Sequence, residues 1–164
     1  MGHLTFLSCL RGVIALNAIL FGGLLSLPAT AAQSETPSPQ SAYLSEARAG
    51  VETVTTEQLR AALTSSTPPL LLDVRTFTER EQGKTITENE IHIPRGFLEF
   101  KAWAQLPQDR EIVVYCATGG RSALAVQTLK AMGWTEVKSL EGGITEFYQS
   151  QGEDCGCIEL PFQE

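Results

Sequence analysis

The sequence predicts an α/β fold in which a parallel sheet carries helices on both faces. Two continuous apolar runs, at 68–74 and 111–116, are typical of strands buried on both faces, and 135–140 is a third predicted strand. Segments with helical periodicity separate these runs, and the alternation continues over about 100 residues. In folds of this class, functional residues gather at the carboxyl ends of the strands.

The first 32 residues are predicted to be a secretory signal peptide. Arg11 precedes an uncharged apolar run at 12–27, and Ala29-Thr30-Ala31 has the pattern of a small-residue cleavage site. An uncleaved membrane anchor is the alternative, although these 16 residues are short for a span, which needs about 20. Cleavage would leave no stable membrane insertion and an exported protein, periplasmic in a Gram-negative bacterium.

The charge balance argues against a nucleic-acid-binding protein. The 164 residues include 19 Asp and Glu against 12 Lys and Arg, which gives a formal net charge of −7. A nucleic-acid surface would need clustered basic residues. We therefore expect no nucleic-acid partner.

Residues 33–50 are predicted to be a disordered linker, because Ser, Pro and Gln dominate their composition. The predicted globular domain follows at 51–150, and a tail occupies 151–164. The domain opens with a short helix, for which Thr55 and Gln58 form a capping box.

The remaining predicted elements alternate between strand and helix after the strand at 68–74. In chain order they are a helix at 99–106, a strand at 111–116, a helix at 122–133, a strand at 135–140 and a helix at 142–152. Pro107 stops the first of these helices and Gly133 ends the second.

A lone cysteine, Cys116, stands at the carboxyl end of the second buried strand. The turn and helix start that follow it are Ala117, Thr118, Gly119, Gly120, Arg121 and Ser122. Glycines let successive backbone N–H groups face inwards as an anion-binding nest, to which a helix N-terminus and an arginine add positive charge. Such surroundings favour a thiolate nucleophile. A structural core cysteine is the alternative, but glycines and an arginine are not packing residues.

Three segments, taken in order, resemble the rhodanese (sulfurtransferase) family over residues 51–150. They are LLLDVRTFTE at 70–79, IHIPRG at 91–96 and VVYCATGGRSALAVQTLKAMGWTEVKSLEGGITEF at 113–147. The resemblance implies a five-stranded parallel sheet flanked by helices, and sulfur transfer that needs no cofactor. Cys116 would take sulfur from a donor such as thiosulfate or a persulfide and pass it to cyanide or a thiol. The N–H groups of the loop would hold the charge of the persulfide.

The resemblance also marks residues around the loop, and each has two interpretations. Asp73 and Arg75 match the Asp-Val-Arg of the family; they support the loop or form a structural ion pair, and we favour a supporting role over direct catalysis. Arg121 binds an anionic donor or pairs with an acid that shapes the loop. Thr118 offers its hydroxyl to the persulfide or faces solvent. His92 is expected to be structural.

The spacing between Cys116 and Arg121 separates this chain from phosphatases. It is C-x₄-R, whereas dual-specificity phosphatases of similar fold have C-x₅-R, which makes room for a tetrahedral phosphate. The shorter loop fits a sulfur atom better.

Cys155 and Cys157 form a C-x-C pair in the tail, which the resemblance does not explain. They form a disulfide locally or with another chain, or they resolve Cys116 by accepting its sulfur or forming a disulfide with it. Two thiolates without a nearby histidine make a poor metal site, so no metal is predicted. These thiols keep a second function class open, a non-catalytic or thiol-redox module that binds a partner protein.

Overall fold

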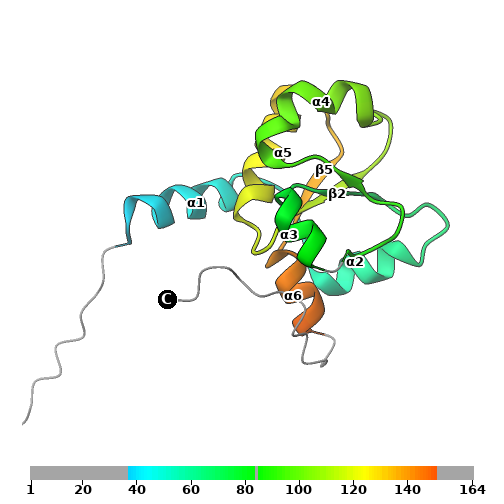
Figure 1. Ribbon diagram of the computed structural model, residues 1–164, viewed down its shortest axis with the longest axis horizontal. Helices are drawn as coiled ribbons and strands as arrows, with labels where there is room; N and C mark the ends of the chain where they lie inside the picture. The colour runs from blue at the N-terminus through cyan, green and yellow to red at the C-terminus, as the bar shows by residue number, and fades with distance from the viewer. Residues whose placement is uncertain (1–36, 84, 151–164) are drawn as a thin grey trace, which may run out of the picture. The chain divides into compact units, whose positions relative to one another are not determined.

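The computed structural model describes residues 37–83 and 85–150, and within them five strands form one parallel sheet (Figure 1). The strand order is β1-β5-β4-β2-β3, which places β4 in the middle. The strands are β1 (Thr53–Val54), β2 (Leu70–Asp73), β3 (Ile91–His92), β4 (Ile112–Tyr115) and β5 (Val137–Leu140). The predicted α/β class and the five-stranded parallel sheet are confirmed.

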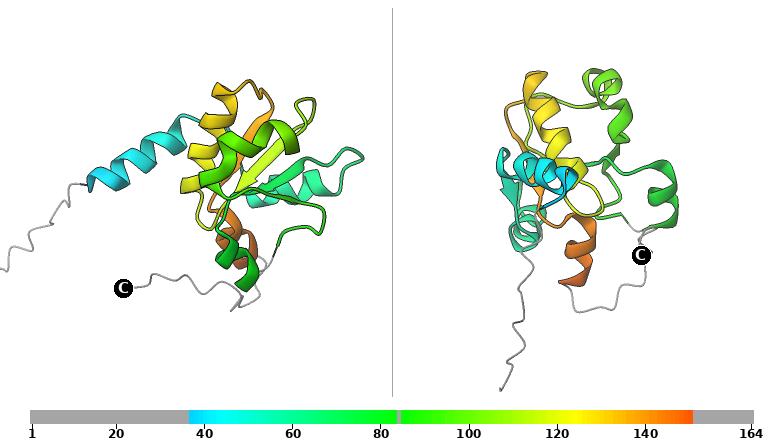
Figure 2. Two further views of the ribbon diagram at one scale, coloured as in Figure 1. Left: turned by 45° about the horizontal axis from the view of Figure 1, so that its top comes forward. Right: turned by 90° about the vertical axis from the view of Figure 1, so that its left-hand side faces the viewer.

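The helices of the described residues cover both faces of this sheet. They are α1 (Pro39–Ala49), α2 (Thr56–Leu63), α3 (Phe77–Gln82), α4 (Leu98–Gln105), α5 (Gly120–Ala131) and α6 (Gly143–Gln149), with a short 3₁₀ turn at Arg95–Phe97 before α4. Figure 2 shows α4 and α5 on one side of the sheet and α2 and α6 on the other.

Alternation along β4 builds two hydrophobic cores. Ile112 and Val114 pack with α4 and α5, whereas Val113 and Tyr115 pack with α2 and α6. All four side chains are buried, as the continuous apolar run predicts. Cys116 follows on the same face as Val114 and so belongs to the core beneath α5.

The predicted linker is wrong over Pro39–Ala49, where the chain forms α1. Ser38 caps this helix by accepting a hydrogen bond from Ser41 N at 3.1 Å, and proline fits its first turn. Ala47 is buried against α5, and Gln127 Nε2 donates to the Ala47 carbonyl at 3.3 Å. Ser38 and Pro39, whose residue types suggested a linker, therefore form a helix start.

Other predictions for the two ends of the chain lie outside the described residues. These are the signal peptide at 1–32, the first residues of the predicted linker, and the tail with Cys155 and Cys157. Within 37–83 and 85–150, no helix has both the length and the apolar character that crossing a membrane requires.

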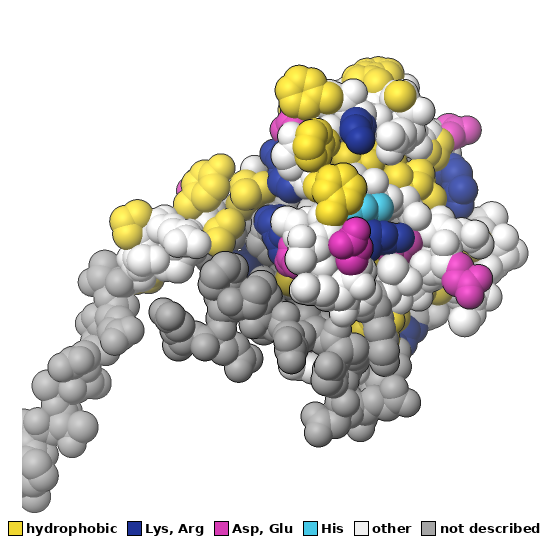
Figure 3. All heavy atoms as spheres, in the orientation of Figure 1, with side chains coloured by type: hydrophobic (Ala, Val, Ile, Leu, Met, Phe, Trp, Pro, Cys, Tyr) yellow, Lys and Arg dark blue, Asp and Glu magenta, His cyan; other side chains and the backbone are white. Residues whose placement is uncertain are grey.

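Apolar side chains gather at the surface over α3 and α4 (Figure 3). Phe77, Phe97, Phe100 and Trp103 are between 46% and 84% exposed. The Phe77 ring stands edge-on to His92 at 5.2 Å between centroids, and it lies 6.3 Å from the Phe97 ring. An aromatic surface therefore begins just after the carboxyl end of β2, the end of the sheet where the catalytic candidates also lie.

Candidate active site

Cys116 directly follows β4, and the chain from Ala117 to Gly119 turns into α5 within three residues. The cysteine side chain is only 1% exposed. Gly119 is the residue before the helix and has φ = +89°, a conformation that side chains disfavour. The thiol thus lies at the carboxyl end of the central strand, as predicted, and its burial is the property expected of the alternative, a core cysteine.

Polar groups of the loop and of β5 surround the sulfur. The backbone N–H of Gly119 donates to Cys116 Sγ at 3.2 Å, and Sγ lies 3.8 Å from the Ser122 hydroxyl. That hydroxyl donates to the Gly119 carbonyl at 3.1 Å and accepts from the Ser139 hydroxyl at 2.9 Å. Ser139 is a residue that sequence analysis missed, and its signal would have been a polar residue inside a buried strand.

The start of α6 holds the backbone of the candidate catalytic loop, residues 116–121. Ile144 N donates to the Cys116 carbonyl at 2.9 Å, and Thr145 N donates to the Ala117 carbonyl at 3.1 Å. Gly143 has φ = +62°, and a methyl group added there would lie 2.5 Å from the Cys116 carbonyl oxygen. This glycine therefore lets the last helix approach the loop closely enough for both hydrogen bonds.

Arg121 pairs with an acid, the second of its two predicted roles. Its Nη1 and Nη2 atoms donate to Glu79 Oε2 and Oε1 at 2.7 and 2.5 Å. The hydrogen bond from Arg121 lowers the pKa of Glu79 to about 2, and the same contact raises the pKa of Arg121. The Arg121–Glu79 pair therefore compensates the positive charge at the start of α5. Thr118, the other loop residue with two interpretations, is exposed.

Glu79→Gln is expected to lower the free energy of unfolding by about 1 kcal/mol at pH 7. Glutamine can still close the capping box with Thr76, so the variant removes mainly the charge opposite Arg121. Because the folded-state pKa of Glu79 lies below its ordinary value of 4.5, this stabilisation is present above pH 4.5 and is lost as the pH falls towards about 2.

Urea unfolding at pH 7, 4 and 2.5 measures this dependence. Glu81→Gln on the same helix is the matched control, since Glu81 is exposed. A wild-type advantage over Glu79→Gln that stays constant down to pH 2.5 would contradict the role of the ion pair.

Asp73 and Arg75 form a buried ion pair on the other side of the sheet from the thiol. Asp73 accepts from Arg75 N, Nε and Nη2 at 2.8–3.1 Å and from Arg80 Nη1 at 3.0 Å. Arg80 also pairs with Glu90, which accepts from the Tyr115 hydroxyl at 2.6 Å. Burial raises the pKa of Tyr115, so its phenol stays a donor.

The ion pair, the alternative interpretation of Asp73 and Arg75, is thus present, and their support of the loop stays a prediction. The side chain of Asp73 pairs with Arg75 and Arg80, and the backbone of α6 donates to the carbonyls of the loop. His92 is structural, as expected: its Nε2 lies 2.9 Å from the Arg75 carbonyl. Arg80 and Glu90 were missed, because only the folded chain brings Arg80 to Asp73 and Glu90 to Arg80 and Tyr115.

Across residues 37–83 and 85–150, no group of three or more His, Cys, Asp or Glu side chains is placed to hold a metal ion. The candidate site is thus a thiol, the amide that faces it, two buried hydroxyls and a compensated arginine. Cys155 and Cys157 lie outside the described residues, and their predicted resolving role stays a prediction.

Comparison with known proteins gives this arrangement a context. The family model described as "Rhodanese-like domain" matches residues 55–150. A sulfurtransferase from Allochromatium vinosum is 32% identical over 94 residues, which cover 57% of this chain and 85% of that protein. Two further relatives, from two strains of Mycobacterium tuberculosis and described as "Probable adenylyltransferase/sulfurtransferase MoeZ", are 34% identical over 107 residues, which cover 62% of this chain but only 26% of those proteins.

Two solved structures are similar along most of their own length. A Rhodopseudomonas palustris protein, described as of unknown function and "Possible Tyrosine Phosphatase", is 32% identical with a TM-score of 0.59 and covers 77% of this chain and 98% of its own. A rhodanese-related protein from Thermoplasma volcanium is 31% identical with a TM-score of 0.53 and covers 60% and 92%.

Proposed function

The chain belongs to the rhodanese-like family, and we propose that it is a sulfurtransferase that carries sulfur as a persulfide on Cys116. The observation that carries the proposal is the placement of the sulfur. It is buried at the carboxyl end of β4, and the Gly119 amide points at it from 3.2 Å. A fixed N–H donor of this kind stabilises negative charge on sulfur without reorganisation during the reaction.

The proposed cycle has two displacements. The Cys116 thiolate attacks the outer sulfur of thiosulfate, the sulfur–sulfur bond of the donor breaks, and sulfite leaves with the bonding electron pair. The enzyme then holds a persulfide anion beside the Gly119 amide. Cyanide or a thiolate attacks the outer sulfur of that persulfide and restores the Cys116 thiolate. Neither displacement needs a cofactor.

The loop favours persulfide donors over thiosulfate in this proposal. Ala117 and Thr118 carry no charge, and Glu79 compensates Arg121. A dianionic donor therefore meets little net positive charge in the loop itself. Steady-state kinetics check this point, since a Michaelis constant for thiosulfate in the low micromolar range would contradict it.

Incubation with thiosulfate is expected to add about 32 Da, one sulfur atom, to the intact protein, and cyanide is expected to remove it. The reason is that Cys116 is the nucleophile in the cycle above. Electrospray mass spectrometry of the intact chain measures both steps. A loss of about two hydrogens in a disulfide that includes Cys116, with no sulfur gained, would instead support the thiol-redox module that binds a partner protein.

Phosphate-ester hydrolysis is the second candidate, because the Rhodopseudomonas palustris structure carries the description "Possible Tyrosine Phosphatase". The C-x₄-R spacing from Cys116 to Arg121 and the engagement of Arg121 by Glu79 argue against it. We expect p-nitrophenyl phosphate to be hydrolysed no faster by the wild-type chain than by Cys116→Ser. Hydrolysis that depends on Cys116 would favour the phosphatase.

We also propose that the chain is exported with the loss of residues 1–32, on the strength of the apolar run at 12–27 and the site at Ala29-Thr30-Ala31. Fractionation of a Gram-negative host that expresses the full chain, followed by N-terminal sequencing, tests this. A new N-terminus near residue 32 in the periplasmic fraction is expected. Full-length chain in the membrane fraction would favour an uncleaved anchor instead.

A further inference from the structure

Helix α1 lies against the catalytic loop, although it precedes the region that the family model matches. Leu44 and Arg48, one helical turn apart, face the glycines of the loop. A methyl group added at Gly120 would lie 3.6 Å from Leu44 Cδ2 and 3.2 Å from Arg48 Nη2. Gly119 also lies beside Arg48, since a methyl group there would be 3.9 Å from Arg48 Nε.

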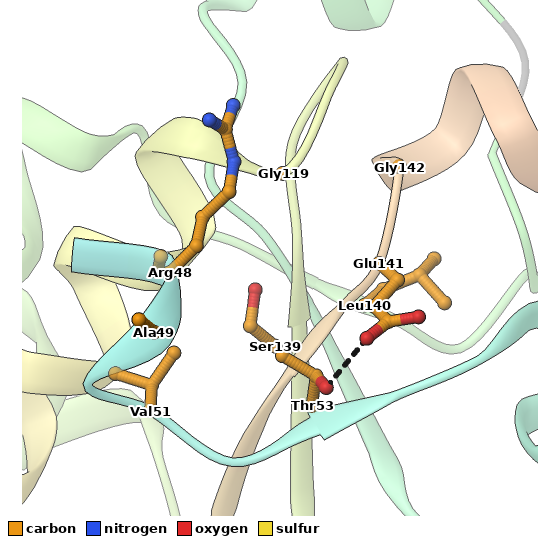
Figure 4. Close-up of a pocket in the computed structure, with 10 residues that line it drawn as sticks. Arg48, Ala49, Val51, Thr53, Gly119, Ser139, Leu140, Glu141 and Gly142 are labelled. Carbon is orange, nitrogen blue, oxygen red and sulfur yellow. Dashed lines mark hydrogen bonds between the residues drawn. The ribbon is translucent and has the colours of Figure 1, made fainter. Parts of the chain in front are cut away.

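These contacts bring the Arg48 guanidinium near the nucleophile. Gly119 N lies 3.2 Å from Cys116 Sγ, so Arg48 Nε is no more than about 10 Å from the sulfur when standard bond lengths link the contacts. Figure 4 shows the Arg48 side chain extending from the end of α1 beside Gly119. Arg48 also borders a cavity of about 520 Å³ that runs from this point to Gly142.

Arg48 differs from the other arginines around the sheet edge in its charge balance. Glu79 pairs with Arg121, and Asp73 and Glu90 pair with Arg80. Among residues 37–83 and 85–150, no carboxylate forms an ion pair with Arg48, and its side chain is exposed. Its positive charge is therefore available to a ligand that approaches the loop.

We propose that Arg48 is a specificity-determining residue that attracts small anionic sulfur donors, above all dianions, to Cys116. The inference rests on the proposed sulfurtransferase function. It assigns part of the charge selectivity of the site to α1, which lies before the matched domain, beside the loop arginine Arg121, which interacts with both Glu79 and Cys116. A cation at this distance acts through Coulomb attraction, so its effect grows with the charge of the donor and falls as salt screens it.

Two donors of different charge test the proposal: thiosulfate, a dianion, and methanethiosulfonate, a monoanion. Arg48→Gln is expected to lower kcat/KM by about fivefold for thiosulfate and by about twofold for methanethiosulfonate. Arg48→Lys keeps the charge and is expected to stay within about twofold of wild type for both. Raising the ionic strength is expected to reduce wild-type kcat/KM for thiosulfate more steeply than that of Arg48→Gln.

Arg110→Gln is the matched control, because Arg110 is exposed and its Nη2 contacts the Pro68 carbonyl, which precedes β2. Arg110→Gln is expected to leave kcat/KM unchanged for both donors. Equal losses for both donors in Arg48→Gln would show that Arg48 only supports the loop, and no loss would show that it has no role; either result overturns the inference. A wild-type chain that gains no sulfur from either donor or from a low-molecular-weight persulfide would instead refute the proposed function.

Discussion

Cys116→Ser is expected to lower the rate of sulfur transfer by at least about 1,000-fold and to abolish the gain of about 32 Da from thiosulfate. Serine cannot form a persulfide, and its hydroxyl is a far weaker nucleophile than a thiolate. The substitution nonetheless suits the site, because the Gly119 amide and the Ser122 hydroxyl already surround the sulfur with polar groups. The loss should therefore be chemical and not a loss of folding.

Cyanide-dependent thiocyanate formation and intact mass measure the loss together. Thr118→Ala is the matched control, since Thr118 is an exposed residue of the same loop, and it is expected to stay within a few-fold of wild type. Sulfur that still adds to Cys116→Ser would show that another thiol carries it. In that case the double variant Cys155→Ser/Cys157→Ser identifies the carrier.

Gly143→Ala is expected to destabilise the fold by more than about 3 kcal/mol, or to release α6 from the catalytic loop. The added methyl group would lie 2.5 Å from the Cys116 carbonyl oxygen and 2.6 Å from that of Ala117. Those are the two carbonyls to which Ile144 and Thr145 donate. The backbone at φ = +62° adds strain of about 1 kcal/mol for any L side chain.

Substitutions at two other glycines separate the cost of the steric contact from the cost of the backbone strain. Gly133 has φ = +109° with open space around its missing side chain, so Gly133→Ala is expected to cost about 1 kcal/mol. Gly96 has neither the strained backbone nor a neighbour within 4 Å, so Gly96→Ala is expected to cost less than about 0.5 kcal/mol. Urea unfolding ranks the three. A Gly143→Ala cost no larger than that of Gly133→Ala would contradict the close approach of α6.

Strong local signals explain why much of the fold was predictable. The apolar runs around β2 and β4 can be buried only as central strands, and both occupy those places. The capping box of Thr55 and Gln58 starts α2 as predicted. Cys116, followed by two glycines and Arg121, predicted a loop that curls around a thiol, and Gly119 N does donate to the sulfur.

Elements that depend on tertiary contacts were missed. Strands β1 and β3 have two residues each, too few for an alternating pattern, and exist because β5 and β2 pair with them. Helix α1 was not predicted because its composition is polar and its buried residue is Ala47. The partners of Asp73 and Arg121 come from side-chain geometry, which a linear spacing does not contain.

Because of the hydrogen bonds from α6 to the loop, opening of the loop around Cys116 breaks contacts of the last described helix. The amide hydrogens of Ile144 and Thr145 have acceptors that move whenever the Cys116 loop opens. Their exchange with deuterium therefore reports the opening free energy of the loop, at positions distinct from the nucleophile itself. If charge on the persulfide tightens the loop, sulfur loading will slow exchange at the start of α6, and one isotope measurement will follow the state of the nucleophile.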